Sequence, residues 1–390
     1  EGRKTSSSFF SSASSRSEED GRGERVPSLN SLRQAQGPLI KKDKTKERME
    51  TPHTDIGQLG EFGLIDHLAS KFTLHRRDTL KGIGDDAAVL DYGGDPVIVT
   101  TDLLVEGIHF DLMYHPLKHL GYKAVIVNLS DICAMNAIPK HITVSIAISN
   151  RFSVEAVDEL YEGIRIACEA YEVDLVGGDT TSSPRGLTIS VTAVGSIAAD
   201  RIAYRSGAKA GDILCVTGDL GAAYLGLQIL EREKQVFLAA PDMQPQLTEK
   251  KYLVGRQLKP EARLEAVRYF EKSGLLPTAM IDISDGLASD LMHICKASSV
   301  GAFIEEAQVP IHDEARMQAI EFQMDPITCA LSGGEDYELL FTVDPKDLDK
   351  IRFMDSVYII GEMVPKEDGI TLHTSGGQIH PVTAQGWTHF

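Results

Sequence analysis

Aspartates beside small residues recur along the chain, in segments whose carboxylates could hold metal ions. Each segment is an apolar or β-rich run that ends in an acidic residue flanked by Gly, Ser or Thr. The segments are GIGDDAAVL with Asp85 and Asp86, VTTDLLVEGIHF with Asp102, VNLSDICAM with Asp131, LVGGDTT with Asp179, IDISDGLASD with Asp282 and Asp285, and LSGGEDYEL with Glu335 and Asp336. A single such aspartate is typical of a turn or helix cap, but six similar segments in one chain favour a shared site.

A cluster of carboxylates is unstable by self-repulsion unless cations neutralise it. Oxygen-only ligands favour hard divalent ions such as Mg²⁺, which also bridge carboxylates to nucleotide phosphates. Several Mg²⁺ ions would let a chain with a formal net charge of −18 accept a phosphorylated ligand. We therefore expect a magnesium and phosphate site, provided that the acidic segments converge in the fold.

Rival phosphate and metal motifs fit less well. GIGDDA matches G-x-G-x-x-A formally, yet a Rossmann loop opens a helix and offers bare N–H groups to phosphate, whereas two carboxylates and a strand-like AAVL stand here. The sequence contains neither G-x-x-x-x-G-K-[ST] nor G-x-S-x-G. His115 and His119 have the spacing of zinc ligands, but Pro116 lies between them, and we interpret both as surface residues.

The amino-acid composition argues against several classes of function. The 390 residues are 42% hydrophobic, enough for two ordinary domains. The excess of acidic residues would repel nucleic acids and anionic membranes, and no apolar run approaches the roughly 20 residues that cross a bilayer. Five scattered cysteines, none in a C-x-x-C pair, indicate a reducing cytoplasm rather than a disulfide framework or a zinc site.

Alternating strands and helices must position the acidic segments. Strands are predicted from about Val97 and over 141–149, 187–198, 301–310, 335–343 and 357–364, where β-branched and apolar residues dominate. Helices are predicted over 60–72, 153–171, 222–230 and 261–272, and after the acidic turn at 282–285. Ser153 stands at the N-cap position of the second helix.

Residues 1–54 differ in composition from the remainder. This segment is rich in Ser, Arg and Glu and poor in aliphatic residues, so we predict a disordered extension or a remnant of cloning or upstream translation. The rest divides near Ala199, where the sequence shifts to turn residues. The predicted domains are therefore 55–199 and 200–390.

Seven blocks, in order, resemble the thiamine-monophosphate kinase family. The blocks are GIGDDAAVL, TTDLLVEGIHF, KAVIVNLSDICAMNAIP, GGDTT, RSGAKAGD, IDISDGLASDL and LSGGEDYEL, and the resemblance covers about residues 57–390. This family belongs to an ATP-binding superfamily with aminoimidazole ribonucleotide synthetase, selenophosphate synthetase and a hydrogenase maturation protein. The resemblance implies direct, in-line transfer of the ATP γ-phosphoryl group to thiamine monophosphate, giving thiamine diphosphate without a general base or covalent nucleophile.

The resemblance also implies an α/β fold with mixed sheets in two domains. The domain at 55–199 would bind ATP and Mg²⁺, and its sheet would pair with that of a second subunit in a barrel-like homodimer core. The domain at 200–390 would be a sheet covered by helices. ATP and thiamine monophosphate are the expected partners, in the cytoplasm, without nucleic acid or membrane.

Site residues follow from the resemblance, position by position. The implied Mg²⁺ shell is Asp86, Thr100, Thr101, Asp102, Asp131, Asp179, Asp282 and Asp285, the implied ATP contacts are Tyr161, Gly178, Asp179, Arg205 and Ser284, and the implied substrate contacts are His109, Glu335 and Trp387. Without the resemblance, Tyr161 is interpreted as a half-buried core aromatic and His109 as a structural histidine. For Arg205 a surface position in a turn, and for Trp387 a C-terminal anchor, remain alternatives to ligand contact. Asp85 is interpreted as orienting the loop of Asp86, with an exchange of roles between the two as the alternative.

Two alternatives remain. An enzyme similar to aminoimidazole ribonucleotide synthetase would share ATP and Mg²⁺ but bind a ribonucleotide amidine, and SGGEDYEL favours the thiamine interpretation. A non-catalytic nucleotide sensor or acidic metal-binding module would tolerate the loss of Asp86 or Asp285, whereas an enzyme needs the whole carboxylate set.

Overall fold

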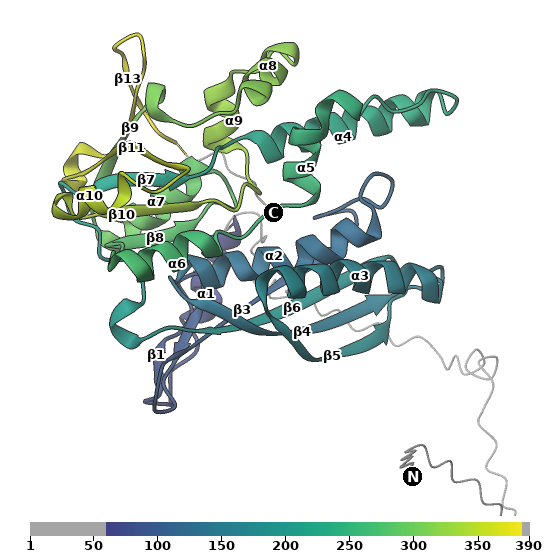
Figure 1. Cartoon of the computed structure of the whole chain (residues 1–390), viewed down its shortest axis with the longest axis horizontal. Coiled ribbons are helices and arrows are strands. Elements are labelled where there is room, and N and C mark those ends of the chain that lie inside the picture. Colours follow the sequence, from purple (N-terminus) through teal and green to yellow (C-terminus); the bar gives the residue numbers. More distant parts are fainter. Residues whose placement is uncertain (1–59, 384–390) are drawn as a thin grey trace, which may run out of the picture. The chain divides into compact units, whose positions relative to one another are not determined.

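Two mixed β-sheets with accompanying helices make up residues 60–383, the part of the chain that the computed structural model describes (Figure 1). The predicted extension at 1–54 and the predicted substrate contact Trp387 lie outside these residues. The mixed α/β class with two sheets is confirmed. Pairing of sheets in a dimer barrel stays a prediction.

The first sheet has six strands in the order β1-β2-β3-β6-β4-β5, and β5 joins β4 in parallel while the other neighbours are antiparallel. The strands are β1 (Thr79–Lys81), β2 (Ala88–Leu90), β3 (Val97–Val105), β4 (Ile138–Ile148), β5 (Asp174–Ser182) and β6 (Leu187–Ser196). Along β6 buried and half-buried residues alternate, as expected for a strand with one covered face. Leu187, Ile189 and Val191 point to the covered face.

Helices α2 (Leu117–Ala134) and α3 (Val154–Tyr171) lie on that covered face (Figure 1). Helix α2 is apolar around most of its circumference, which is typical of a helix buried on all sides. From Leu120 to Ala134 every residue is buried except Asp131. The helix packs against β3, β4 and β6 of the first sheet and β8 of the second, so it lies between the two halves of the molecule, each made of one sheet and its helices.

Two glycines allow α2 and α3 to approach closely. A Cβ atom on Gly121 would lie 1.9 Å from the carbonyl oxygen of Leu160, and one on Gly163 would lie 1.9 Å from that of Lys118. Any larger residue would therefore push the helices apart.

The second sheet has seven strands in the order β13-β12-β9-β11-β7-β10-β8. Its strands are β7 (Ile213–Thr217), β8 (Ala279–Asp282), β9 (Gly301–Glu305), β10 (Leu339–Val343), β11 (Val357–Val364), β12 (Ile370–His373) and β13 (Ile379–Pro381). The helices of this half are α4 (Ala222–Ala239), α5 (Lys251–Leu258), α6 (Leu264–Ser273), α7 (Leu287–Ser298), α8 (Asp313–Glu321), α9 (Pro326–Ser332) and α10 (Leu348–Ile351).

The two faces of this sheet enter different cores. Met280 and Phe341 belong to the core that also contains residues of α2 and α6, and the rings of Phe341 and Phe270 lie 5.1 Å apart. Ile281 and Leu340 belong to a second core with α7. Strand β8 therefore joins both halves of the molecule just before Asp282.

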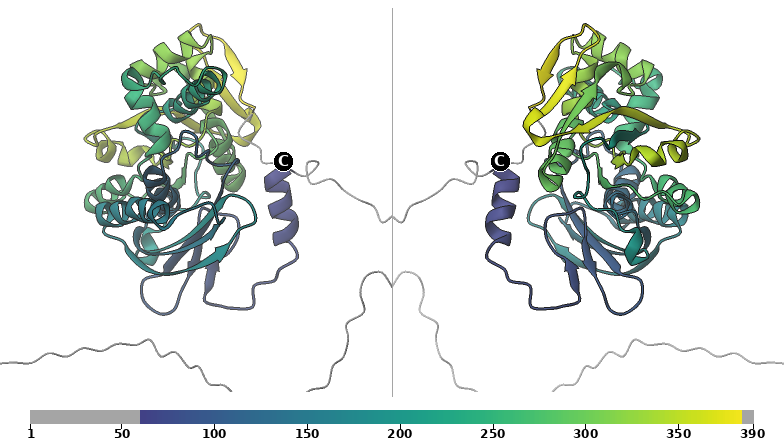
Figure 2. Two further views of the ribbon diagram at one scale, coloured as in Figure 1. Left: turned by 90° about the vertical axis from the view of Figure 1, so that its right-hand side faces the viewer. Right: turned by 90° about the vertical axis from the view of Figure 1, so that its left-hand side faces the viewer.

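Most predicted elements are present, with instructive differences. Ser153 caps α3, accepting a hydrogen bond from the Ala156 amide at 3.3 Å. The predicted helix at 60–72 is α1 (Gly60–Ala69), which stands at the side of the sheets in Figure 2 and has no buried residue. The strand predicted over 335–343 begins at Leu339, because Glu335 and Tyr337 have positive φ. His115 is buried, so its interpretation as a surface residue is wrong.

All five cysteines are free, and four of them are buried. Between residues 60 and 383, no helix combines the length and apolarity needed to cross a bilayer.

Candidate active site

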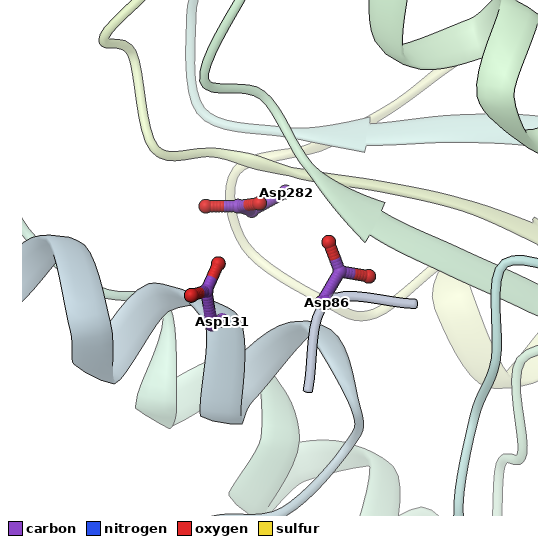
Figure 3. Close-up of side chains that lie close together, drawn as sticks. All are labelled: Asp86, Asp131 and Asp282. Carbon is purple, nitrogen blue, oxygen red and sulfur yellow. The ribbon is translucent and has the colours of Figure 1, made fainter. Parts of the chain in front are cut away.

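Three aspartates from distant segments meet between the two halves. Asp86 lies in the loop between β1 and β2, Asp131 on α2, and Asp282 at the end of β8. One carboxylate oxygen of each lies within 4.8 Å of the others (Figure 3). The predicted convergence of acidic segments is thus present for these three residues. Asp131 occupies a helix, however, and not the strand end that the sequence pattern indicated.

The loop that carries Asp86 is fixed by its neighbour Asp85. Gly84 has φ of +113°, which favours glycine and turns the chain at this point. The Asp85 carboxylate then points inward, 3.1 Å from Lys81 Nζ, and accepts a hydrogen bond from the Arg205 amide at 3.0 Å. This arrangement leaves Asp86 to face the cluster, where Arg205 Nη2 donates to its Oδ1 at 2.7 Å.

Hydroxyl donors orient the other two aspartates. Thr100 of β3 donates to Asp131 Oδ2 at 2.6 Å, and Ser130 donates to Asp282 Oδ2 at 2.5 Å. Asn128 accepts a hydrogen bond from the Asp102 amide at 2.9 Å. Polar residues in this turn of α2 therefore bind both the Thr100–Asp102 part of β3 and Asp282 of β8.

Burial and mutual repulsion raise the pKa values of the clustered carboxyl groups. Burial, followed by the charges of Asp102, Asp282 and Asp86, raises the pKa of Asp131 well above its usual range. Burial, followed by the charge of Asp86, raises the pKa of Asp282 to about 7, and burial raises that of Asp102 to about 6. Carboxylates in this condition bind either protons or a cation.

The residues present fit Mg²⁺. Oδ2 of Asp86 is buried without a hydrogen-bond partner, although a buried carboxylate oxygen normally has one. The grouped donors are all carboxylate oxygens, the ligand type that Mg²⁺ prefers. Arg205 neutralises one charge of the cluster, which leaves an excess of negative charge for a divalent ion.

A second acidic loop follows β8. The Asp285 amide donates to Oδ2 of Asp290 at 3.2 Å, and Asp290 is itself buried on α7. Ser284 accepts, through its carbonyl oxygen, a hydrogen bond from the Glu335 amide at 2.8 Å. The loop 283–286 is therefore joined to the loop before β10, and this bond brings Ser284, Asp285 and Glu335 close together.

A cavity of about 1000 Å³ opens next to the cluster. Its lining includes Asp131, Asp282 and Asp285, together with residues of α4 and α9. Other lining residues include Asp102, His109, Asp111, Tyr114, Val127, Tyr224, Glu231, Lys234, Gln257, Ser284, Glu335 and Tyr337. The lining therefore combines several carboxylates with the aromatic rings of Phe110, Tyr114, Tyr224 and Tyr337.

The two described substrate-contact candidates both line this cavity. His109 accepts a hydrogen bond at Nδ1 from the Val105 amide at 3.0 Å, which fixes its ring at the end of β3. Glu335 lies 2.8 Å from Nζ of Lys123. Trp387 lies outside the described residues.

Other predicted residues do not line the cavity. Gly178 and Asp179 lie on β5, an edge strand whose residues are all exposed, and Tyr161 packs on the core from α3. Thr101 donates to the Val191 carbonyl at 3.0 Å and is exposed, whereas its neighbour Thr100 reaches Asp131. The assignments of these residues remain predictions.

Sequence reasoning missed several residues of the site. Lys123 and Gln257 contact Glu335, Ser130 contacts Asp282, and Asp290 contacts the Asp285 loop. Lys123 left one detectable signal, because it is a lysine in an otherwise apolar run and precedes Asp131 by eight residues. Ser130 and Asp290 lie inside the quoted segments VNLSDICAM and IDISDGLASD but were not singled out, and Gln257 left no comparable signal.

Comparison with known proteins defines the class. The family model described as AIR synthase related protein, N-terminal domain, matches residues 84–197, and the corresponding C-terminal domain model matches residues 209–373. A fold of two mixed sheets with acidic residues at their junction is thus that of an AIR-synthase-related protein.

Individual proteins similar to this chain identify its family within the AIR-synthase-related class. Thiamine-monophosphate kinase of Aquifex aeolicus (strain VF5) is 36% identical over 86% of this chain and 99% of the relative, and that of Bacillus subtilis (strain 168) is 37% identical over 75% and 86%. The structure of AaThiL complexed with AMPPCP and TMP is 33% identical, with a TM-score of 0.73 over 87% of this chain and 99% of that one. The chain belongs to the thiamine-monophosphate kinase family.

Proposed function

We propose that this chain transfers the γ-phosphoryl group of ATP to thiamine monophosphate, giving thiamine diphosphate and ADP. The observation that carries the proposal is the meeting of Asp86, Asp131 and Asp282 beside a cavity whose lining includes Asp131, Asp282 and several aromatic rings. A related structure holds AMPPCP and TMP, which are an ATP analogue and the expected acceptor. Carboxylates that can hold metal-bound phosphates and aromatic rings that can contact a heterocycle match these two ligands.

Asp86, Asp131 and Asp282 would hold Mg²⁺, with Asp102, Asp285 and the Thr100–Thr101 segment around them. Bound Mg²⁺ would neutralise the phosphate charges that otherwise oppose the meeting of two polyanions. Asp179 is assigned to the same shell by family resemblance.

The protein groups have mainly a positioning role. An acceptor phosphate is already nucleophilic, so phosphoryl transfer requires alignment and charge neutralisation more than a general base. Arg205 places a guanidinium beside Asp86 and would face the ATP phosphates there. Ser284 would contact ATP from the loop after β8, and Tyr161 and Gly178 are further ATP contacts by resemblance.

A homodimer is part of the proposal. Every residue of β5 is exposed, including Leu175 and Val176, and Leu103 of β3 is also exposed. An edge strand with exposed apolar side chains favours pairing with another chain. A second subunit on this sheet would also cover Gly178 and Asp179, which lie on the same strand.

The domain boundary near Ala199 and a cytoplasmic location are also proposed. The boundary is supported by the gap between the matched regions at 84–197 and 209–373. The free thiols of all five cysteines support a reducing compartment.

The test is to incubate the purified protein with ATP, Mg²⁺ and thiamine monophosphate and to quantify thiamine diphosphate and ADP by chromatography. We expect equal amounts of both products, and loss of both on addition of EDTA. Absence of thiamine diphosphate, together with turnover of a formylglycinamidine ribonucleotide, would instead support the aminoimidazole ribonucleotide synthetase alternative. Nucleotide binding without any product would support a sensor.

A further inference from the structure

A lysine is completely buried in the middle of α2. The exposed fraction of Lys123 is 0%, and it is among the largest fully buried side chains of the described residues. Lysine is almost never fully buried unless its ammonium group is paired. The Nζ atom lies 2.8 Å from Glu335 Oε1 and donates to the carbonyl oxygen of Gln257 at 3.1 Å. Lys123 therefore joins α2, α5 and the loop before β10 at one point.

The carboxylate of Glu335, the partner of Lys123, lies on the cavity wall. The side chain of Glu335 is 29% exposed and lines the cavity wall. Its second oxygen, Oε2, accepts a hydrogen bond from Gln257 Nε2 at 2.5 Å. Its backbone has φ of +65°, which is uncommon for a residue with a side chain, and its amide donates to Ser284 at 2.8 Å. Both the backbone and the carboxylate of Glu335 are thus held in place from behind.

The same face of α2 connects this carboxylate to the acidic cluster. Lys123, Val127 and Asp131 are spaced four residues apart, so they lie on one face of the helix. Val127 and Asp131 line the cavity, and Lys123 holds Glu335 beside it. At a rise of 1.5 Å per residue, Lys123 and Asp131 are separated by about 12 Å along the helix axis. One rigid helix therefore sets the distance between Asp131 and the Glu335 carboxylate that Lys123 holds.

We propose that Lys123 is a positioning residue that holds the Glu335 carboxylate in place to receive the cationic, N–H-bearing ring system of the phosphate acceptor. The proposal rests on the proposed function and names the part of the substrate that this end of the cavity binds. The phosphate of the acceptor lies at the Asp131 end, and its ring system lies toward Glu335. Lys123 itself does not touch the substrate, because it is buried behind the carboxylate.

A purely structural role explains the pair less well. Replacing a buried ion pair with apolar residues is often neutral for stability or even stabilising. The Lys123–Glu335 pair, in contrast, places one partner on the wall of a binding cavity and fixes both of its carboxylate oxygens. Such an arrangement lowers the cost of ordering a binding group when the ligand arrives.

The test compares Lys123→Met, Glu335→Gln and the double variant with wild type, measuring kcat and the KM values for thiamine monophosphate and ATP. Lys118→Met is the matched control, because Lys118 lies on the same helix and pairs with a glutamate, but is 52% exposed. We expect Lys123→Met to raise the KM for thiamine monophosphate at least about tenfold while the KM for ATP changes less than about twofold. The double variant should be no worse than Glu335→Gln alone, because both changes remove the same contact.

Equal effects on both KM values, or additive effects in the double variant, would show that Lys123 acts on the fold and would overturn the proposal. If Lys123→Met does not fold, Gln257→Met tests the same carboxylate, because it removes the donor to Oε2 and keeps the backbone carbonyl bound by Lys123. A severalfold rise in the KM for thiamine monophosphate alone is expected, and an unchanged KM would contradict the proposal. A wild-type protein that makes no thiamine diphosphate would overturn the proposed function first and this inference with it.

Discussion

The hydroxyl group of Ser130 donates to Oδ2 of Asp282 at 2.5 Å, and this bond joins the central helix of the first half to the last residue of a strand in the second half. Both residues are buried. The bond orients one carboxylate of the cluster from its far side. Asp282 therefore keeps its place in the cluster through a contact made by α2.

Ser130→Ala should weaken metal use without abolishing it. The variant removes the donor that orients Asp282, and such outer-shell contacts typically change metal affinity tenfold or more. We expect the Mg²⁺ concentration for half-maximal activity to rise by about tenfold, with nearly full kcat at saturating Mg²⁺. The measurement is initial rate against free Mg²⁺. A loss of kcat that excess Mg²⁺ does not restore would show that Ser130 has another role.

Asp131→Asn should nearly abolish turnover and leave the fold intact. The amide keeps the size of the side chain but removes one negative charge from the cluster. We expect kcat to fall at least about 100-fold, which is typical for loss of a group that stabilises transition-state charge. Asp355→Asn, at an exposed position before β11, should retain full activity. Near-normal turnover of Asp131→Asn would remove this residue from the metal shell.

The metal-free protein should lose stability as pH rises through the range in which Asp282 titrates. The pKa of Asp282 is raised from 3.8 to about 7, so the folded state binds this proton more tightly than the unfolded state. The stabilisation is fully present below about pH 4 and is lost as pH approaches 7. In EDTA, we therefore expect the Tm of Asp282→Asn minus the Tm of wild type to increase as pH rises. A Tm difference that does not vary between pH 4 and 8 would contradict this picture.

Glu338→Gln should destabilise the protein. The buried Glu338 carboxylate accepts a hydrogen bond from Thr217 at 2.7 Å and pairs with Arg256 and Arg263. Breaking a buried ion pair by removing one charge typically costs about 3 kcal/mol or more. The free energy of unfolding in urea measures the effect. Glu305→Gln, which affects a half-exposed pair with His373, should change stability by less than about 0.5 kcal/mol, and equal losses in the two variants would be unexpected.

Gly121→Ala should separate α2 from α3. The added Cβ would lie 1.9 Å from a backbone oxygen, which a backbone shift alone relieves. Overpacking of this kind costs about 1–3 kcal/mol. Gly255→Ala is the opposite case, because nothing lies within 4 Å of its added Cβ, and its stability should stay equal or rise. Denaturation of both variants by urea tests the pair, and a stable Gly121→Ala variant would show that the helices adjust freely.

The sequence revealed the acidic residues better than the elements that carry them. Asp86, Asp131 and Asp282 were identifiable because small neighbours and repetition marked them, and they lie together in the structure. Helix α2 was not predicted, because a helix buried on all sides has no apolar periodicity to detect.

Pairwise contacts across the fold were beyond prediction from the sequence. The bond from Thr100 to Asp131 and the pair of Lys123 with Glu335 depend on packing between residues far apart in the chain. The apolar spacing of α1 predicted the helix correctly, but Phe62 and Ile65 remain exposed because spacing does not show which partner covers a face.

The continuous burial of α2 has a consequence for how the site tolerates change. Lys123 and Asp131 keep their common face only while the number of residues between them is fixed, since each residue turns the helix by about 100°. Substitutions elsewhere can resize the cavity gradually, but one inserted or deleted residue within 124–130 would turn one of these side chains away from its partner. The segment between them therefore tolerates substitutions, but its length is fixed.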